Sequence, residues 1–290
     1  MKTKSSPRYI NPFTDYGFKL LFGTERNKDL LIDFLNALLR EEEGLITDIT
    51  YLNKEQKGKN KESRTSVYDI YCENQRGERF IVEIQKAKQD HFKDRMVYYS
   101  TFPIQEQAKK GDWNYELKAI YSIAILDFRL PQSDPLDRDI ISEGKLYDLR
   151  KGKIMYDKLT FIYLEMPKFG KEWHECSNHF EKWLYLFKNL NQLQEMPVGL
   201  VERQFKKFLK EAQIANLSKE EYTMYEESLK RYNDLKNSLD TAKEEGREEG
   251  REEGKKAREI EIAKKAKAEG IPLETIMLLT GLSKEVIDKL

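Results

Sequence analysis

Apolar residues recur at helical spacing near the start of the chain and again through its last third. Within residues 14–40 they stand three or four positions apart, the spacing of a helix with one buried face. Thr14 is placed to cap this helix, because a hydroxyl can accept a hydrogen bond from the free amides of a first turn. Gly23 and Thr24 interrupt the pattern, so it predicts a helix broken into two.

From residue 45 the period changes to that of strands. Residues 73–77 predict a hairpin turn between the second and third strands, and residues 90–110 predict a helix. Residues 115–128 end in a continuous apolar run, which predicts a central strand covered on both faces. The expected strands are ITDITYLN, SVYDIYCEN, RFIVEIQKAK, ELKAIYSIAILDF, GKLYDLR and KLTFIYLEMPKF.

From Asn178 onward almost all of the chain has helical spacing. A helix, then several strands with one long helix, then an all-helical tail indicate an α/β fold with a mixed central sheet flanked by helices. We expect three segments. They are a globular domain over residues 1–195, a helical extension over 196–238, and a charged helix with a C-terminal helical interaction segment over 239–290.

Residues 244–255 read EEGREEGREEGK, an internal repeat with glycine at every fourth position. Each unit begins with a glutamate that can pair with a basic residue three positions later, as Glu244 with Arg247. The repeat is either a solvated helix or linker, or a helix whose glycine stripe lets a second helix approach, as in a homodimer. Each glycine costs roughly 1 kcal/mol of helix stability, so an isolated helix here would be marginal. The stripe consists of Gly246, Gly250 and Gly254.

The last segment, residues 270–290, predicts two short helices joined by a Thr-Gly-Leu-Ser turn, with Ser283 as the cap of the second. It resembles half of a helix-turn-helix. Too few residues remain for a full DNA-reading unit, so an interaction module is at least as well supported as a DNA-binding one.

The composition excludes several classes of protein and leaves nucleic acid open. Lys+Arg and Asp+Glu both number 51, and zero net charge neither supports nor excludes DNA, because phosphate affinity is set locally. Cys72 and Cys176 form no Cys-x-x-Cys pair, which argues against a disulfide framework and suits a reducing cytoplasm. No signal peptide, membrane span or glycine-rich phosphate loop is visible. We expect a cytoplasmic protein with no membrane partner and no nucleotide cofactor.

The stretch SVYDIYCENQRGERFIVEIQKAK places three polar side chains on two predicted strands. Asp69 lies in the first strand, and Glu83 and Gln85 lie two apart in the second, on one face. Two buried carboxylates on neighbouring strands repel and lose hydration, and a divalent cation compensates for both. The alternative is that the carboxylates are exposed on the polar face of an ordinary hairpin.

The chain resembles the PD-(D/E)XK nuclease superfamily, and more closely the bacterial Rpn family of recombination-promoting nucleases and transposase-like proteins. The resemblance begins at NPFTDYGFKLLFG, continues through VYDIYCENQRGERFIVEIQ and the Arg-Met-x-Tyr-Tyr of residues 95–99, and reaches YELKAIYSIAILDF. It spans roughly residues 7–190, and the EEGR-type tail is also typical. It implies a restriction-endonuclease-like core.

The resemblance also implies a chemistry. Asp69 and Glu83 would bind Mg²⁺, with Mn²⁺ as a substitute, and the backbone carbonyl of Ile84 would be a third ligand. The metal would lower the pKa of a bound water and neutralise charge on the scissile phosphate. Asp15 matches an acidic position that faces the site and would orient a water or help to hold a second metal. Its alternative role is to complement the dipole at the start of its helix.

Gln85 departs from the superfamily pattern, in which most members carry Lys, although Glu-x-Gln is usual in Rpn-like families. A neutral amide can orient a water but cannot stabilise the charge of an attacking hydroxide. Lys86 is expected to point to the opposite face.

A DNA-cleaving site needs cations around it. The lysines and arginines nearest to the site in sequence either contact DNA phosphates or are ordinary solvated side chains. They are Lys54, Lys57, Lys59, Lys61 and Arg64 before the Asp69 strand, and Lys88, Lys93 and Arg95 after the Glu83 strand. A zinc site of His174, Cys176 and His179 is a weaker alternative, because no fourth ligand is apparent.

We therefore expect a metal-dependent DNA endonuclease linked to recombination or transposition, acting as a homodimer through its tail. The alternative is a catalytically weak or silent nuclease fold that binds DNA or protein. A preference for RNA over DNA cannot be separated on sequence.

Overall fold

The computed structural model describes residues 6–39, 43–56, 66–108, 113–130 and 136–290. The chain forms two compact units, Met1–Asn233 and Asp234–Leu290. Helix α6 (Lys219–Ala268) begins in the first unit and ends in the second.

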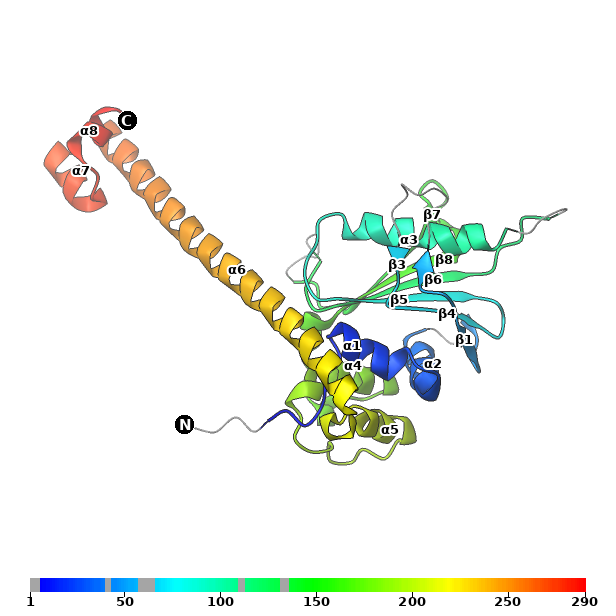
Figure 1. Cartoon of the computed structure of the whole chain (residues 1–290). Coiled ribbons are helices and arrows are strands. Elements are labelled where there is room, and N and C mark those ends of the chain that lie inside the picture. Colours follow the sequence, from blue (N-terminus) through cyan, green and yellow to red (C-terminus); the bar gives the residue numbers. More distant parts are fainter. Residues whose placement is uncertain (1–5, 40–42, 57–65, 109–112, 131–135) are drawn as a thin grey trace. The chain divides into compact units, whose positions relative to one another are not determined.

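The first unit is built on a six-stranded sheet of order β1-β4-β5-β6-β8-β7 (Figure 1). β5, β6 and β8 run parallel, and the other neighbouring pairs are antiparallel, so the sheet is mixed, as expected. Strand β6 is central and every residue in it is buried, which confirms the interpretation of its apolar run. The strands are β1 (Ile49–Tyr51), β4 (Ile70–Asn74), β5 (Arg79–Gln85), β6 (Ile120–Leu126), β7 (Ile141–Asp148) and β8 (Lys153–Glu165).

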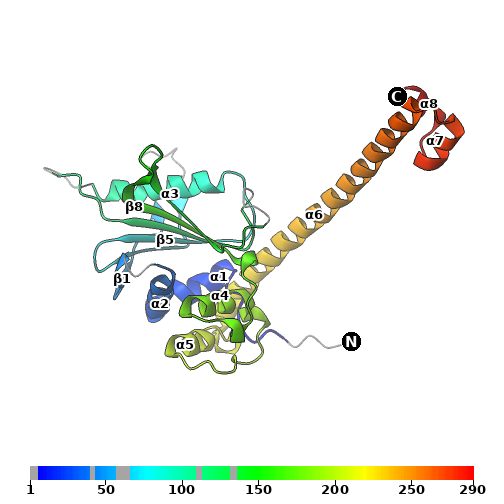
Figure 2. The same ribbon diagram turned by 180° about the vertical axis from the view of Figure 1, so that it is seen from behind.

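Helices cover both faces of this sheet. Figures 1 and 2 show α3 (Phe92–Glu106) on one side and α1, α2 and α4 on the other. The second side holds the main core, in which Phe22 stacks on Phe187 with ring centroids 5.2 Å apart. The helices of this side are α1 (Asp15–Phe22), α2 (Lys28–Leu38), α4 (His179–Asn189) and α5 (Arg203–Glu211).

The broken first helix is confirmed. Thr14 Oγ1 accepts a hydrogen bond from Gly17 N at 3.0 Å, and a turn of 3₁₀-helix, Glu25–Asn27, separates α1 from α2. A Cβ at Gly23 would lie 2.8 Å from the carbonyl oxygen of Lys19, so a larger residue would not fit at the end of α1.

The single strand predicted over residues 66–74 is wrong at its centre. The chain forms a short strand β3 (Ser66–Val67), paired with β2 (Glu55–Gln56), then bends at Asp69 and enters β4. The physical reason is that the Asp69 N–H donates to the Glu83 carboxylate, a side chain, rather than to a strand carbonyl. Asp69 therefore lies in a bend and not in a strand.

Successive side chains of β5 point to opposite faces of the sheet, so each enters either the main core or the layer that contains α3. Phe80, Val82 and Ile84 enter the main core, whereas Glu83 and Gln85 point to the face that α3 covers. Lys86 lies on the α1 side, where it contacts Asp15, as its position in the alternation predicts.

The second unit contains the rest of α6 and two short helices, α7 (Leu273–Thr280) and α8 (Lys284–Asp288), which follow the predicted pattern. Ala263, Ala266, Ile276 and Ile287 form its small core.

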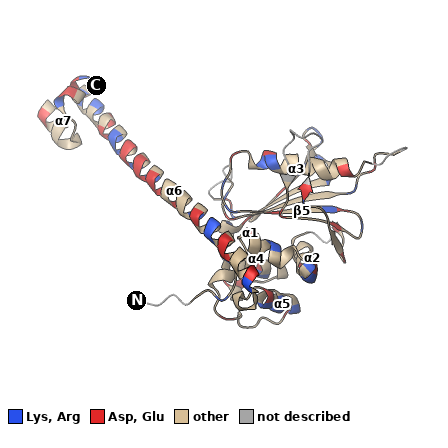
Figure 3. Ribbon diagram, in the orientation of Figure 1, with Lys and Arg blue, Asp and Glu red and all other residues tan. Residues whose placement is uncertain are grey.

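The EEGR repeat of residues 244–255 is helical, and Glu244 and Arg247 pair at 3.9 Å. Figure 3 shows acidic and basic residues following one another along α6. A Cβ at any glycine of the stripe would meet open space within this chain. In the described residues, no helix combines the length and the apolar character needed to cross a membrane.

Candidate active site

One hydrogen bond joins Asp69 to Glu83 at the point where the chain enters β4, and a second joins Asp69 to Ile84, the next residue of β5. The backbone N–H of Asp69 donates to Glu83 Oε1 at 3.1 Å, and the backbone N–H of Ile84 donates to Asp69 Oδ2 at 3.0 Å. The antiparallel pairing of Ile70 with Val82 brings the bend beside β5 and makes this exchange possible. The structure thus brings together the two carboxylates that the sequence predicts.

The Glu83 carboxyl group is buried, with 6% of the residue exposed. Burial, and then the neighbouring charge of Asp69, raise the pKa of Glu83 to about 8. The Asp69 N–H, Arg95 and Lys19 oppose this rise without cancelling it. Burial and the neighbouring acid thus oppose the charged form of Glu83, and a nearby cation would favour that form.

These features fit a hard divalent cation. Carboxylate and carbonyl oxygens are its preferred ligands, and an added positive charge would relieve the repulsion between the two acids. Asp69, Glu83 and the carbonyl of Ile84 could supply such a set. Within the described residues, no group of three His, Cys, Asp or Glu side chains gathers closely enough to hold a metal, so a backbone or solvent oxygen would be needed.

Gln85 is held at both ends of its amide. Its Nε2 donates to the carbonyl of Ala87 at 2.9 Å, and its Oε1 accepts from Arg95 Nη2 at 2.6 Å. Arg95 also donates to Gln89, and its guanidinium lies 4.9 Å from the centre of the Phe92 ring. Gln85 is thus fixed by protein contacts, and Arg95, expected to clasp phosphate, is directed toward the site instead.

Asp15 is paired with Lys86, with Asp15 Oδ1 and Lys86 Nζ 2.8 Å apart. Burial tends to raise the pKa of Asp15, but the hydrogen bond and charge of Lys86 outweigh it and lower that pKa. Asp15 lies on α1, in the layer beneath the sheet, and its recorded side-chain partner is Lys86 rather than either site carboxylate.

The remaining expected DNA contacts lie in different environments. Lys88 and Lys93 are exposed. Lys54 is half-buried, and burial, followed by the nearby charge of Lys19, lowers its pKa. Lys57, Lys59, Lys61 and Arg64 lie outside the described residues.

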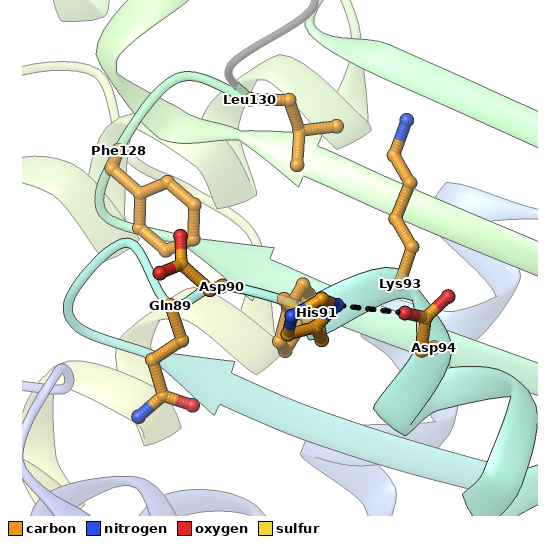
Figure 4. A pocket seen from close by; sticks show the side chains of 8 residues that line it. Gln89, Asp90, His91, Lys93, Asp94, Phe128 and Leu130 are labelled. Carbon is orange, nitrogen blue, oxygen red and sulfur yellow. Dashed lines mark hydrogen bonds and ion pairs between the residues drawn. The ribbon is translucent and has the colours of Figure 1, made fainter.

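A cavity of about 270 Å³ lies at the start of α3, beside the ends of β5 and β6 (Figure 4). Phe92, Phe128 and Leu130 supply its apolar wall, and His91 Nδ1 lies 3.1 Å from Asp94 Oδ2 at its rim. Gln89 lines the cavity and also bonds Arg95, which bonds Gln85, so a chain of hydrogen bonds connects the cavity with Gln85.

The alternative zinc ligands have other partners. His179 Nε2 lies 2.6 Å from Asp33 Oδ2, and its ring stacks on Phe205. The Cys176 thiol donates to the Glu172 carbonyl at 3.4 Å, and burial raises its pKa, which disfavours the thiolate that zinc requires.

Sequence reasoning missed Lys19. Its Nζ lies 3.4 Å from Asp69 Oδ1 and contributes a positive charge to the site from α1. Asp15 and Lys19 are four residues apart, hence on one face of α1, and this spacing could have indicated that both point toward the sheet.

Comparison with known proteins assigns the family. The family model for PD-(D/E)XK nuclease family transposases matches residues 12–242, which include α1, the whole sheet and the site. No curated protein and no solved structure matches the chain. The fold, a mixed sheet flanked by helices with a helical tail, agrees with this match. The chain belongs to the PD-(D/E)XK nuclease family of transposases.

Proposed function

We propose that the protein is a metal-dependent endonuclease that hydrolyses phosphodiester bonds in DNA and serves recombination or transposition. The observation that carries the proposal is the pair Asp69 and Glu83, two acids linked through the Asp69 N–H near the end of β5, in a chain of a nuclease family. Two acids held this close repel each other when both ionise, and a bound cation would relieve that repulsion.

Asp69, Glu83 and the Ile84 carbonyl would hold Mg²⁺ or Mn²⁺. Such a cation supplies a more acidic water and neutralises charge on the phosphate. Arg95 orients Gln85, and the fixed amide closes the α3 side of the site. Asp15, which is about half exposed, would orient a water at the rim. Lys54, Lys88, Lys93 and the lysines and arginine of residues 57–64 would contact the flanking phosphates.

The test is cleavage of supercoiled plasmid by the full chain with Mg²⁺ or Mn²⁺. Asp69→Asn and Glu83→Gln should each slow cleavage by more than about 100-fold. Glu73→Gln is the matched control, because Glu73 is a β4 carboxylate that pairs with Arg79 at 3.3 Å. Equal cleavage by wild type and both site variants would refute the proposal. Single-stranded and duplex RNA in parallel reactions decide between DNA and RNA.

A specific observation favours a second candidate, a catalytically weak or silent nuclease fold that binds DNA or protein. Each end of the Gln85 amide already bonds a protein partner, which restricts its freedom to orient a water. Retention of labelled duplex DNA by wild type, without cleavage in either metal, would support this candidate over the first.

We also propose that the tail makes a homodimer. Support comes from the open glycine stripe on α6 and from Leu278 and Leu279, which are 85% and 64% exposed on α7. Two subunits would bring one carboxylate site to each strand of a duplex.

A further inference from the structure

Lys19 reaches the candidate site from the opposite layer to Gln85. It projects from α1, and its Nζ lies 3.4 Å from Asp69 Oδ1, whereas the Ile84 amide bonds the other carboxylate oxygen, Oδ2. The Lys19 side chain is 38% exposed and that of Asp69 is 15% exposed. The Lys19 ammonium therefore contacts a carboxylate of the site, and its side chain is partly open to solvent, from which a phosphate could approach the same ammonium.

The distance between Lys19 and Asp69 is longer than the distances in two other ion pairs of α1 and α2. Lys86 lies 2.8 Å from Asp15, and Lys28 lies 2.7 Å from Asp48. The Lys19 side chain is more than a third exposed, so solvent screens the pair and limits its contribution to stability. At 3.4 Å, Lys19 is held near Asp69 mainly by charge, so it can turn to another anion at little cost.

A second ammonium group lies close to it. A Cβ at Gly23 would sit 3.3 Å from Lys54 Nζ, which places that group at the end of α1. Burial and then the charge of Lys19 lower the pKa of Lys54, whereas Asp69 raises it. Two lysines thus converge beside Asp69, and only Lys19 has a direct contact with it among the described residues.

We propose that Lys19 is a catalytic residue that supplies the positive charge which the Glu-x-Gln sequence lacks. The proposal rests on the proposed nuclease function. Gln85 is neutral and locked between Arg95 and Ala87, so it cannot provide this charge. Lys19 delivers it from helix α1, on the side of the sheet opposite to the Gln85 side chain.

The step remains an ordinary hydrolysis. The oxygen of a water forms a bond to phosphorus, and its proton passes to solvent. The bond between phosphorus and the leaving ester oxygen breaks, and that oxygen keeps the electron pair and takes a proton from solvent. The Lys19 ammonium transfers no proton and stabilises the negative charge that develops on the attacking and phosphoryl oxygens.

Two measurements on the full chain test this role, plasmid cleavage and calorimetric titration with Mn²⁺. Lys19→Met should slow cleavage by about 100-fold. It should also leave Mn²⁺ affinity unchanged or tighten it by about threefold to tenfold, because a positive charge beside Asp69 opposes the metal. Lys19→Arg, which keeps the charge, should recover most of the cleavage. Lys28→Met is the matched control, since Lys28 is 37% exposed and also pairs with a single aspartate.

The outcomes separate the two proposals. Cleavage reduced less than about tenfold in Lys19→Met, with an active wild type, overturns the catalytic role alone. Cleavage lost together with weaker Mn²⁺ binding also overturns it, because Lys19 would then only hold Asp69 in place. A wild type that neither binds Mn²⁺ nor cleaves refutes the nuclease function, and the role of Lys19 falls with it.

Discussion

The backbone N–H of Asp69 donates to the side chain of Glu83, and the Asp69 side chain in turn accepts from the next amide of β5, that of Ile84. These two hydrogen bonds hold the acidic side chains of Asp69 and Glu83 close together in a largely buried site. A carboxylate whose position is fixed by backbone amides cannot move away from its neighbour to relieve repulsion. The geometry of the pair is thus set before any cation arrives, as a metal site requires.

Stability of the metal-free protein should depend on pH through Glu83. Its pKa in the fold is about 8, above the ordinary 4.5. Between these values the folded state holds a proton that the unfolded state has lost. The free energy of unfolding is therefore highest below the lower pKa, falls by up to about 1.4 kcal/mol per pH unit, and levels off above about pH 8.

Denaturant unfolding in EDTA, from about pH 5 to pH 9, measures this dependence. Glu83→Gln cannot ionise, so it should lack the slope and be more stable than wild type at alkaline pH. Parallel curves for the two proteins would show that Glu83 does not titrate in this range.

Lys168→Met should destabilise the first unit strongly. Lys168 Nζ lies 2.8 Å from Glu165 and 2.7 Å from Asp137, and the side chains of Lys168 and Glu165 are 0% exposed. Removing one partner leaves a buried charge uncompensated, which costs about 3 kcal/mol or more. Lys171→Met removes an exposed pair with Glu181 and should cost less than about 1 kcal/mol. Chemical denaturation compares them, and equal losses would contradict the prediction.

Lys88→Ala and Arg95→Ala should affect different steps. Lys88 is exposed, so its loss should weaken DNA binding and reduce the salt dependence of the affinity by about one unit of slope. Arg95 bonds Gln85 and Gln89, so its loss should slow cleavage by about tenfold or more with little change in that slope. Affinity measured at several salt concentrations, together with single-turnover cleavage, distinguishes them. An equal fall in slope for both would place Arg95 on the phosphates.

Gly250→Gln separates the two interpretations of the repeat. A Cβ at Gly250 meets nothing within 4 Å in this chain, so the change should favour the helix by somewhat less than about 1 kcal/mol. If the glycine stripe is the dimer contact, light scattering should show a dimer for wild type and a monomer for the variant. An unchanged mass would assign the repeat to a solvated helix.

Local features of the site follow from the sequence. The hairpin of residues 73–77 returns β5 alongside β4, and alternation puts Glu83 and Gln85 on one face, so the approach of Glu83 to Asp69 was predictable. The bend at Asp69 was not, because residues 66–74 are uniformly strand-like and the bend depends on a contact with Glu83, fourteen residues away. The family resemblance, carried by these same residues, was also visible in the sequence and is confirmed.

The identity of the groups around the carboxylates was decided only by the tertiary structure. Lys19 faces Asp69, Asp15 faces Lys86, and Arg95 faces Gln85. Each contact joins two layers of the fold, and the first two join segments at least fifty residues apart. Periodicity reports only which side of its own helix or strand a residue occupies. The side chain that such a residue contacts depends on how α1 and α3 pack against the sheet. That packing depends on the side chains of the whole helix–sheet interface.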